Sequence, residues 1–379
     1  MASSPGGGPR PPPDGPRGPE AARPSEGTAA FAIRRRLRGL HSLGWGIHGR
    51  TPGIGPGARL GALAGVALLL AVPPFLSPYA VHTLVLVLFF AYLGTAWNVL
   101  GGYAGQFSFG HAAFFGIGAY TSTLLLVRLG VSPWIGLVAG GLLAAAFGCF
   151  AGYLSFRYGL RGPYFALVTL AFAEMLRLIA VNWMAIGGPM GILMPLSKTG
   201  DSVWRLQFRE KLPYYYVALG LVLGVLWLVR AIERSRLGHL LAAIRENEDA
   251  AEASGVNTLS TKLVAMAVSA FLTAIGGTFY AQYFSFIDPG LVFGPAVSVE
   301  ILLRPIVGGP GTLLGPLLGS IVLTPLSEVT RALIRGRPGV DVMVYGALLV
   351  VVITFLPGGL VGAWRRIVRP GGLWRPRQA

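Results

Sequence analysis

Residues 60–127, LGALAGVALLLAVPPFLSPYAVHTLVLVLFFAYLGTAWNVLGGYAGQFSFGHAAFFGIGAYTSTLLLV, contain no Asp, Glu, Lys or Arg. One membrane-spanning helix needs only about 20 predominantly apolar residues, so this stretch predicts several spans. Strands of a membrane barrel would alternate apolar and polar residues, whereas these runs are continuously apolar. Helices satisfy all their backbone hydrogen bonds within lipid. The stretch therefore predicts an all-α fold, a polytopic transmembrane helical bundle.

The composition of the 379-residue chain also indicates a membrane protein. Hydrophobic residues make up 53% of it and charged residues only 12%, with a mean hydropathy of +0.63, so one soluble core could not enclose the apolar surface. The net charge of +16 would favour nucleic acid as the partner of a soluble protein, but this surplus lies in tails and short loops beside apolar segments. Membrane topology explains that distribution. We therefore expect a lipid bilayer around the chain and no nucleic-acid partner.

The apolar segments predict about ten spans. The region 291–327 is too long for one span and short for two, and the cluster VGGPGTLLGPLLG at 307–319 interrupts it, which predicts two short helices. The other expected spans are 60–77, 79–99, 105–127, 133–155, 163–183, 213–232, 263–286 and 340–357.

Arginine-rich segments flank the spans at both ends. Residues 1–58 are rich in Arg, Pro and Gly, which predicts a disordered tail, and residues 363–379 form a second basic tail without acids. Arginine marks the cytoplasmic side, and an even number of spans returns the chain to its starting side, so we expect both termini in the cytoplasm. Residues 59–362 then form the membrane domain. Three arginines, Arg331, Arg335 and Arg337, would lie outside and disagree with this scheme.

The polar segment AAIRENEDAAEASGVN, residues 242–257, lies in the expected cytoplasmic loop between two spans. Its Ala, Glu, Leu and Arg content predicts a helix over about 238–255 that ends at Gly255. An apolar stripe from Leu237 to Ile244 lies beside a charged face, so this amphipathic helix could lie in a groove of another protein. The alternative is a solvated connector on the lipid headgroups.

Several longer motifs resemble one family of membrane transport proteins. Asp249-Ala250-Ala251 followed by Gly255 resembles the EAA loop of ATP-binding-cassette (ABC) importer permeases, with Asp in the place of the usual Glu. SRLGHLLAAIRENEDAAEASGVN at 235–257 and YAGQFSFGHAAFFGIGAY at 103–120 are similar to the LivM-type permeases of branched-chain amino acid importers. YFALVTLAFAEMLR at 164–177 and VGGPGTLLGPLLG at 307–319 extend the resemblance over about residues 80–362.

The resemblance implies a permease domain at 59–362 in a multi-subunit importer of the prokaryotic inner membrane. The implied partners are two ABC ATPase subunits, a second LivH-like permease and a periplasmic or lipid-anchored solute-binding protein. The implied cargo is a branched-chain amino acid; urea or short amides are the alternative, as is a stand-alone carrier coupled to an ion gradient. The residues implied to couple the chain to the ATPases are Arg245, Glu246, Glu248, Asp249, Ala250, Ala251, Glu252 and Gly255.

The chain lacks the motifs of an enzyme. The sequence contains no G-x-x-x-x-G-K-[ST] phosphate-binding loop, and its three lysines, Lys198, Lys211 and Lys262, follow no such glycines. The five histidines have no metal-ligand spacing, and no serine lies in a nucleophile motif. We therefore expect that this chain binds no metal or cofactor and that partner subunits bind and hydrolyse ATP.

Polar residues at the start of the expected span 105–127 are candidates for the solute pathway. Polar groups inside a span are costly and usually face the protein interior or a wet cavity. Ser108 and His111 share a face if this segment is helical, Phe115 continues that face, and Gln106 points elsewhere. These four residues are the predicted pathway, and an interhelical hydrogen bond is the alternative role for the polar ones.

Two acid–base pairs lie within expected spans. Glu174 and Arg177 are three residues apart, and Glu300 and Arg304 are four apart, so each acid can pair with a base on its own helix. We favour structural pairing for both. The alternative is that they gate or line the transport route. The glycines of the 307–319 cluster could break a helix near the membrane midplane or form a tight turn.

Overall fold

The computed structural model describes residues 65, 67–195, 202–333, 346 and 359–362. These residues form a helical bundle, which confirms the predicted fold class. The two tails and nearly all of the expected span 340–357 lie outside the described residues, as do residues 60–64 and 66 of the expected span 60–77. The helices are η1 Pro73–Phe75, α3 Pro78–Asn98, η2 Val99–Tyr103, α4 His111–Leu129, α5 Pro133–Arg157, α6 Pro163–Asn182, η3 Met184–Ile186, η4 Gly188–Met190, α7 Lys211–Arg234, α8 Arg236–Glu246, α9 Glu248–Ala253, α10 Thr258–Phe284, α11 Pro289–Phe293, α12 Pro295–Gly308 and α13 Gly315–Leu333.

Within the described residues, seven helical segments are long and apolar enough to cross a membrane. They are Pro78–Tyr103, His111–Leu129, Pro133–Arg157, Pro163–Asn182, Lys211–Arg234, Thr258–Phe284 and Pro289–Gly308. Each corresponds to an expected span, with the last one representing the first half of 291–327. The total of ten spans and the side on which the termini lie remain predictions.

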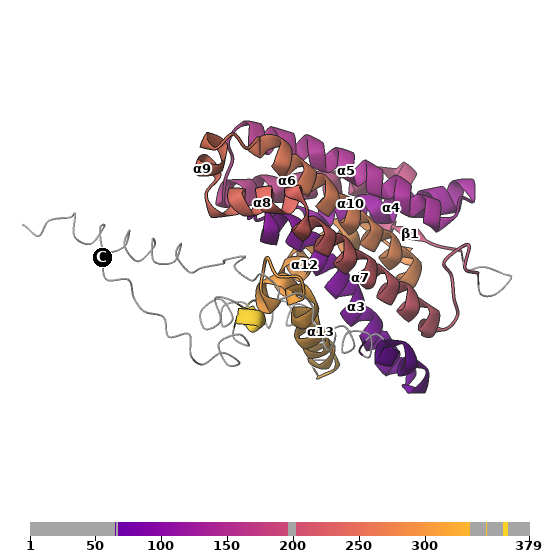
Figure 1. The fold of residues 1–379 in the computed structure, drawn as a ribbon. Coiled ribbons are helices and arrows are strands. Elements are labelled where there is room, and N and C mark those ends of the chain that lie inside the picture. The colour runs from indigo at the N-terminus through magenta and orange to yellow at the C-terminus, as the bar shows by residue number, and fades with distance from the viewer. Residues whose placement is uncertain (1–64, 66, 196–201, 334–345, 347–358, 363–379) are drawn as a thin grey trace, which may run out of the picture. The chain divides into compact units, whose positions relative to one another are not determined.

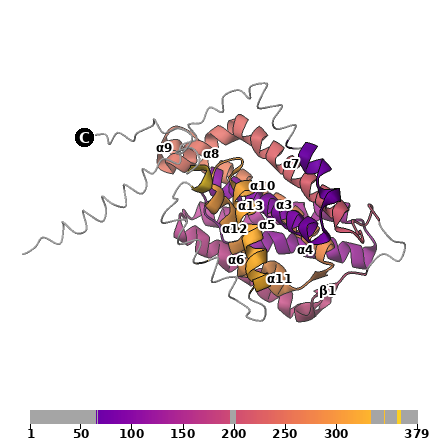
Figure 2. The same ribbon diagram turned by 90° about the horizontal axis from the view of Figure 1, so that it is seen from below.

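The two ends of the bundle differ in structure. Helices α8 and α9 lie together at one end, and β1 (Ile192–Leu193) lies at the opposite end in both views (Figures 1 and 2). There β1 pairs antiparallel with β2 (Phe286–Ile287), with Ile192 opposite Ile287. The long helices run between these two ends.

Small residues allow the central helices α4, α5 and α10 to pack closely. A side chain at Gly118 of α4 would collide with the backbone of Ala274 in α10, and one at Gly277 of α10 would collide with the backbone of Phe115. Such close backbone approach is typical of helix pairs in membranes, where lipid supplies no hydrophobic drive for association. The glycines of the 103–120 motif therefore include packing positions.

Local signals set the helix ends. Ser77 and Ser132 precede Pro78 and Pro133, and their hydroxyls accept hydrogen bonds from Ala80 and Trp134 in the first helical turns. Asn257 begins α10 in the same way, because its Oδ1 accepts from the Ser260 amide at 2.9 Å.

Helix α4 begins later than predicted. The expected span starts at residue 105, whereas residues 104–110 form a loop and the helix begins at His111. The preceding helix continues beyond Asn98 as a π-helical turn, η2, which ends at Tyr103. Ser108 therefore does not share a helical face with His111. Gly105 has a φ of +68°, which favours glycine and ends the turn.

The glycine cluster separates two helices, α12 and α13, as predicted for 291–327. Helix α12 ends at Gly308, residues 309–314 form a loop, and α13 begins at Gly315. Gly311 in this loop has a φ of +70°. Asn98 at the end of α3 secures the loop, because its Oδ1 accepts from the Gly311 amide at 2.8 Å and its Nδ2 donates to the Thr312 carbonyl at 3.0 Å.

Candidate functional site

The polar segment after α7 forms two helices instead of the single one predicted. Asn247 separates α8 from α9 with an extended backbone, φ −159° and ψ 107°, and its Oδ1 accepts from the Ala250 amide at 3.0 Å. Asparagine competes with helix continuation in this way, which explains the break. Gly255 follows α9 with a φ of +85°, so it terminates the helical segment as expected.

The eight residues predicted to contact an ATPase divide between two faces of this segment. Arg245 and Glu248 are half-buried and Ala251 is buried against the bundle. The other five are exposed and define what we call the α8–α9 outer face: Glu246, Asp249, Ala250, Glu252 and Gly255. On the opposite side of α8, Leu241 and Ile244 are buried and fix the helix to the bundle.

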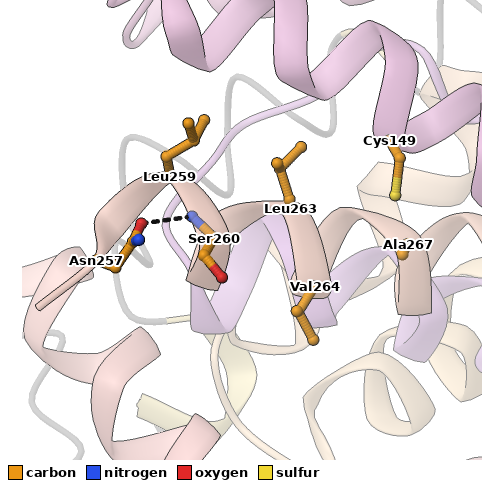
Figure 3. Close-up of a pocket in the computed structure, with 7 residues that line it drawn as sticks. All are labelled: Cys149, Asn257, Leu259, Ser260, Leu263, Val264 and Ala267. Atoms are coloured by element: carbon orange, nitrogen blue, oxygen red, sulfur yellow. Dashed lines mark hydrogen bonds between the residues drawn. The ribbon is translucent and has the colours of Figure 1, made fainter.

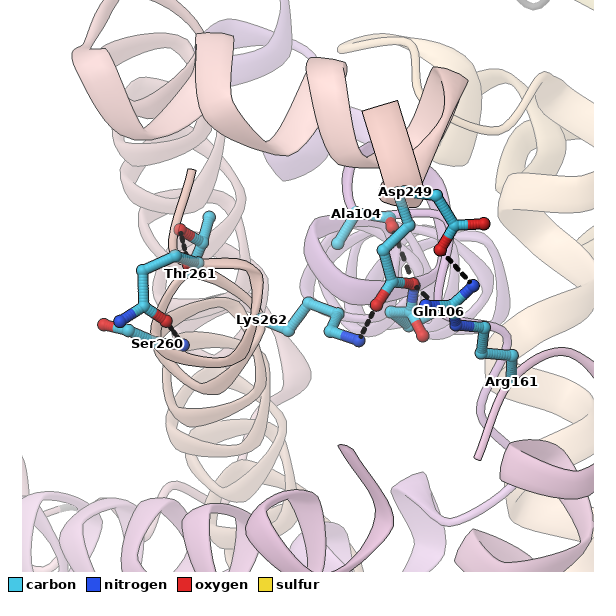
Figure 4. A network of polar contacts seen from close by, with 9 residues as sticks. Ala104, Gln106, Arg161, Asp249, Ser260, Thr261 and Lys262 are labelled. Atoms are coloured by element: carbon cyan, nitrogen blue, oxygen red, sulfur yellow. Dashed lines mark hydrogen bonds and ion pairs between the residues drawn. The ribbon is translucent and has the colours of Figure 1, made fainter. Parts of the chain in front are cut away.

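Ion pairs join α9 to two neighbouring segments (Figure 4). Lys262 of α10 donates to Glu248 at 2.6 Å, and this lysine side chain is only 3% exposed. Its ammonium also lies over the Phe156 ring, 4.6 Å from the centroid. Arg161, from the loop between α5 and α6, donates to Asp249 at 2.8 Å and lies 3.6 Å from Glu248. Two acidic side chains of α9, Glu248 and Asp249, are thus paired with basic residues of the same chain.

The hydrogen bond from Arg161 to Asp249, together with Glu248, raises the arginine pKa further above its usual range. Arg245 has the opposite shift. Burial lowers its pKa, although Glu246 and Tyr103 act against that change. The difference follows from position, because Arg161 lies at the surface and Arg245 is turned into the chain.

Arg245 lies against two glycines from other segments. A side chain at Gly105 would come within 3.1 Å of the Arg245 Cγ. A side chain at Gly311 would overlap the Arg245 guanidinium. Helix α8 therefore contacts the loop before α4 through the arginine stem and the α12–α13 loop through its head group.

The predicted pathway residues are all buried in this structure. His111 is fully buried, and its Nε2 lies 2.8 Å from the Ser269 hydroxyl, which donates to the Ala96 carbonyl. Because the Ser269 proton is used, Nε2 must be the protonated ring nitrogen of His111. Ser108 accepts a bond from Trp97 at its carbonyl, and Gln106 donates to the Ala104 carbonyl at 3.3 Å (Figure 4).

Phe115, the fourth predicted pathway residue, belongs to an aromatic cluster. Its ring lies 5.3 Å from Tyr280 and 6.3 Å from Phe89, so it packs between α10 and α3. The four residues therefore do not line one common open space. His111 has the interhelical hydrogen bond that the alternative interpretation requires, whereas Ser108 lies in the loop before α4 and its hydroxyl accepts from the Gly110 amide. A transport role for these four residues stays a prediction.

The first acid–base pair lies near the middle of a spanning helix. Arg177 contacts Glu174 through Nη2 at 2.5 Å and Nε at 2.9 Å. Glu174 is the twelfth of the 20 residues of α6, and its side chain is 38% exposed, with 29% for Arg177. This pair is formed within one helix yet is partly uncovered by the described chain.

The second pair has different surroundings. The Arg304 side chain is 1% exposed and lies over the Phe90 ring, 3.7 Å from its centroid. Its Nη1 bonds the Glu300 carbonyl and lies 3.9 Å from the Glu300 carboxylate. Arg304 is thus enclosed between α12 and α3, in agreement with a structural role.

A groove of about 290 Å³ lies between α5 and the start of α10 (Figure 3). Cys149 of α5 and Leu263 and Ala267 of α10 are among its lining residues. No charged side chain lines it. Among the described residues, no three His, Cys, Asp or Glu side chains could hold a metal ion together.

The sequence of the chain matches a known family. The model of the family described as "branched-chain amino acid transport system / permease component" matches residues 79–353. The chain belongs to this family. It is 31% identical over 324 residues to the high-affinity branched-chain amino acid transport system permease LivM of Escherichia coli, which covers 80% of this chain and 75% of that protein. As a permease component, the chain is not itself an enzyme.

More distant members of the permease family are also similar. The LivH permease of the same Escherichia coli system is 22% identical, over 72% of this chain and 91% of its own length. The autoinducer 2 import system permease LsrC of Photorhabdus luminescens is 25% identical, over 55% of this chain and 69% of its own. No solved structure matches the chain.

Three contacts of this permease were not expected from its sequence. Lys262 is the buried partner of Glu248. Its position directly before the apolar run 263–286 is the sequence feature that could have indicated a buried, paired lysine. Arg161 is the partner of Asp249, and Asn98 secures the Gly311 loop. Neither Arg161 nor Asn98 lies near its partner in sequence, so no local spacing could predict them.

Proposed function

We propose that the chain is the LivM-like permease subunit of an ATP-driven importer for branched-chain amino acids in the prokaryotic inner membrane. The observation that supports this most directly is the α8–α9 outer face. It is a short, exposed, acidic helical surface at one end of a bundle of spanning helices, in a chain that is 31% identical to LivM. Such a surface suits docking in the groove of a partner protein.

Two ABC ATPase subunits are the proposed motors, one of them docking on this face from the cytoplasm. A motor can shift the permease between outward-open and inward-open states only through contacts that differ in free energy between the two states. The ion pairs of Glu248 with Lys262 and of Asp249 with Arg161 hold α9 to the bundle. Displacement of α9 would therefore pull on the loop after α5 and the start of α10.

The second permease, a LivH-like chain, is proposed to cover α6 beside Glu174 and Arg177. Ionised groups at mid-depth are costly against lipid, even when they are paired. Their exposed fractions of 38% and 29% leave them in contact with the surroundings of the described chain. A permease partner would remove that contact with lipid and place the pair at the interface through which solute passes.

The solute would be delivered by a periplasmic or lipid-anchored binding protein. Discrimination by one methylene group is worth only about 1 to 3 kcal/mol, so the permease needs few polar contacts to the side chain of the cargo. We retain Gln106, Ser108, His111 and Phe115 as the proposed route. Because all four are buried, the route would open only when α4 moves relative to α10.

The test is reconstitution of the chain with its ATPases, second permease and binding protein in proteoliposomes. We expect uptake of labelled leucine that requires ATP hydrolysis and is reduced by valine and not by urea. Uptake without any ATPase, or competition by urea alone, would contradict the proposal.

A surface variant tests the docking site itself. Glu252→Arg on the outer face is expected to weaken ATPase co-purification by about tenfold, because reversing an interface charge creates repulsion. Arg157→Ala is the control, since Arg157 is exposed at the same end of the bundle but lies outside that face. Equal co-purification of the ATPase with both variants would exclude this face as the docking site.

A further inference from the structure

Arg245 connects the α8–α9 segment with the parts of the bundle that have irregular backbone. It was expected on the ATPase-facing side, but its side chain is half-buried and crosses Gly105 and Gly311. Buried Leu241 and Ile244 anchor the same helix, so the Arg245 backbone has a fixed position relative to them. Movement of α8 would therefore move the guanidinium.

The two segments that Arg245 contacts are the ones where the helices are interrupted. Gly105 follows the π-helical turn η2, and Gly311 lies in the loop between α12 and α13. π-helical turns and broken helices occur often at functional sites of membrane proteins, because they supply backbone that can rearrange. Both glycines have positive φ, +68° and +70°, and both leave space that the arginine fills.

Asn98 joins these two segments to each other. It belongs to the end of α3, immediately before η2, and it bonds the backbone on both sides of the Gly311–Thr312 peptide. A side chain at Gly102 in η2 would come within 2.5 Å of the Gly311 amide nitrogen. Segments 99–105 and 309–314 therefore form one packed unit, and Arg245 of α8 lies against both.

We propose that Arg245 is the positioning residue that transmits movement of the α8–α9 segment to the packed unit of residues 99–105 and 309–314. This inference rests on the proposed function, because it assumes that ATPases move α8 and α9. The arginine stem pushes against Gly105, and the planar head group displaces the Gly311 loop. The hairpin of α12 and α13 and the end of α3 then move together.

The chemistry of the contact explains why arginine and glycine are needed. A guanidinium is planar and rigid, presents several donors, and remains charged when partly desolvated, whereas a lysine ammonium is compact and lies on a flexible stem. Glycine at 311 provides both the positive φ and the room for this head group. Alanine there would be strained and would displace the guanidinium.

Arg245→Met is the main test, because methionine keeps an apolar stem against Gly105 and deletes the head group against Gly311. In the reconstituted importer, we expect ATPase co-purification and ATP hydrolysis within about twofold of wild type, with solute transported per ATP reduced by about tenfold or more, the equivalent of about 1.4 kcal/mol of lost coupling. Arg157→Met is the matched control and should leave this ratio unchanged. An unchanged ratio in Arg245→Met would overturn the inference.

Gly311→Ala tests the same contact from the other side. Because both substitutions disrupt one contact, the double variant Arg245→Met/Gly311→Ala should transport no less per ATP than the worse single variant. If the loss of solute transported per ATP in the double variant equals the product of the two single-variant losses, the inference is overturned. Should Arg245→Met fail to assemble, Arg245→Lys and Gly311→Ala supply the same measurement, and normal coupling in both would overturn it.

The experiments separate the role of Arg245 from the importer function as a whole. If wild-type transport needs no ATPase, the proposed function itself is wrong. If wild-type transport is ATP-driven and the Arg245 and Gly311 variants retain the wild-type ratio of solute to ATP, only the role of Arg245 is wrong.

Discussion

Two glutamate–base contacts in this permease have similar lengths and opposite surroundings. Lys262 contacts Glu248 at 2.6 Å at the α8–α9 end of the bundle, with 3% and 14% of the two side chains exposed. Arg177 contacts Glu174 at 2.5 Å near the middle of α6, with 29% and 38% exposed. The pair that is closer to the end of its span is enclosed by its own chain, and the pair at mid-depth is not.

The difference indicates which contacts are complete within one subunit. An ion pair enclosed by the chain has its desolvation cost offset by its own geometry and by neighbours such as the Phe156 ring. An ion pair exposed at mid-depth in a bilayer would lack such neighbours and would favour association with another protein. The first pair should therefore determine the stability of the chain, and the second should determine assembly.

Lys262→Met should have the largest effect on stability. It leaves the half-buried Glu248 with Arg161 at 3.6 Å as its remaining basic neighbour, and loss of one partner of a buried pair costs about 3 to 5 kcal/mol. The measurement is the free energy of unfolding in mixed micelles. Lys262→Met/Glu248→Gln removes both charges and should recover most of the loss. A single variant as stable as wild type would remove the distinction between the two pairs.

Glu174→Gln should have the next largest effect, on assembly. In the isolated chain the loss should be small, because partly exposed pairs contribute about 0.2 to 1 kcal/mol. In the complex, Arg177 would be left unpaired at the interface, which costs about 2 kcal/mol or more and weakens permease–permease association by more than tenfold. Co-purification of the second permease measures this effect.

The control for this prediction identifies what covers α6. Leu167→Cys, on the exposed side of the same helix, should form cross-links to the second permease. Glu174→Gln/Arg177→Met, which leaves no unpaired charge, should restore association in part. Cross-links only within one chain would mean that another span of this chain covers α6, and the comparison with Glu248 would then lose its meaning.

The bundle could be predicted from the sequence because lipid imposes one simple requirement, a continuous apolar run of sufficient length. The expected spans 79–99, 133–155 and 163–183 agree with α3, α5 and α6 to within about two residues at every end. The error at 105–127 has a physical cause. Residues 104–110 are apolar enough for a helix, but their backbone bonds elsewhere, with Gly110 donating to Ser108 and Phe109 to Thr169.

The candidate site was predictable only in part, because the orientation of charged side chains depends on distant segments. Spacing placed Glu174 with Arg177 correctly, since both lie on one helix. It also grouped Arg245 with Glu246 and Asp249 on one charged face. That grouping was wrong for Arg245, because this residue follows the buried Leu241 by four positions and so lies on the inner side of α8. Its side chain packs against glycines more than 60 residues away in the sequence.

Arg161→Gln should have the smallest effect of these variants on the free energy of unfolding. The Arg161 and Asp249 side chains are 48% and 76% exposed, and pairs of this kind contribute about 0 to 1 kcal/mol. The contact with Asp249 raises the pKa of Arg161. The ion pair therefore contributes fully to the free energy of unfolding below the usual arginine pKa, and this contribution is lost only as the pH rises through the raised value. No change with pH is therefore expected from Arg161 between about pH 6 and 9, far below the titration range of arginine.

Salt should instead reveal the Arg161 contact, because the Debye length falls from about 10 Å at 0.1 M to about 3 Å at 1 M. The difference in unfolding free energy between wild type and Arg161→Gln should shrink at 1 M salt, whereas the difference for Lys262→Met should persist, since water and ions are excluded from a lysine that is 3% exposed. Equal salt sensitivity of both differences would mean that Glu248 and Asp249 form one solvated cluster. In that case the α8–α9 segment would be held to the bundle by its buried apolar residues, among them Leu241, Ile244 and Ala251, and the charges of α9 would be available to a partner.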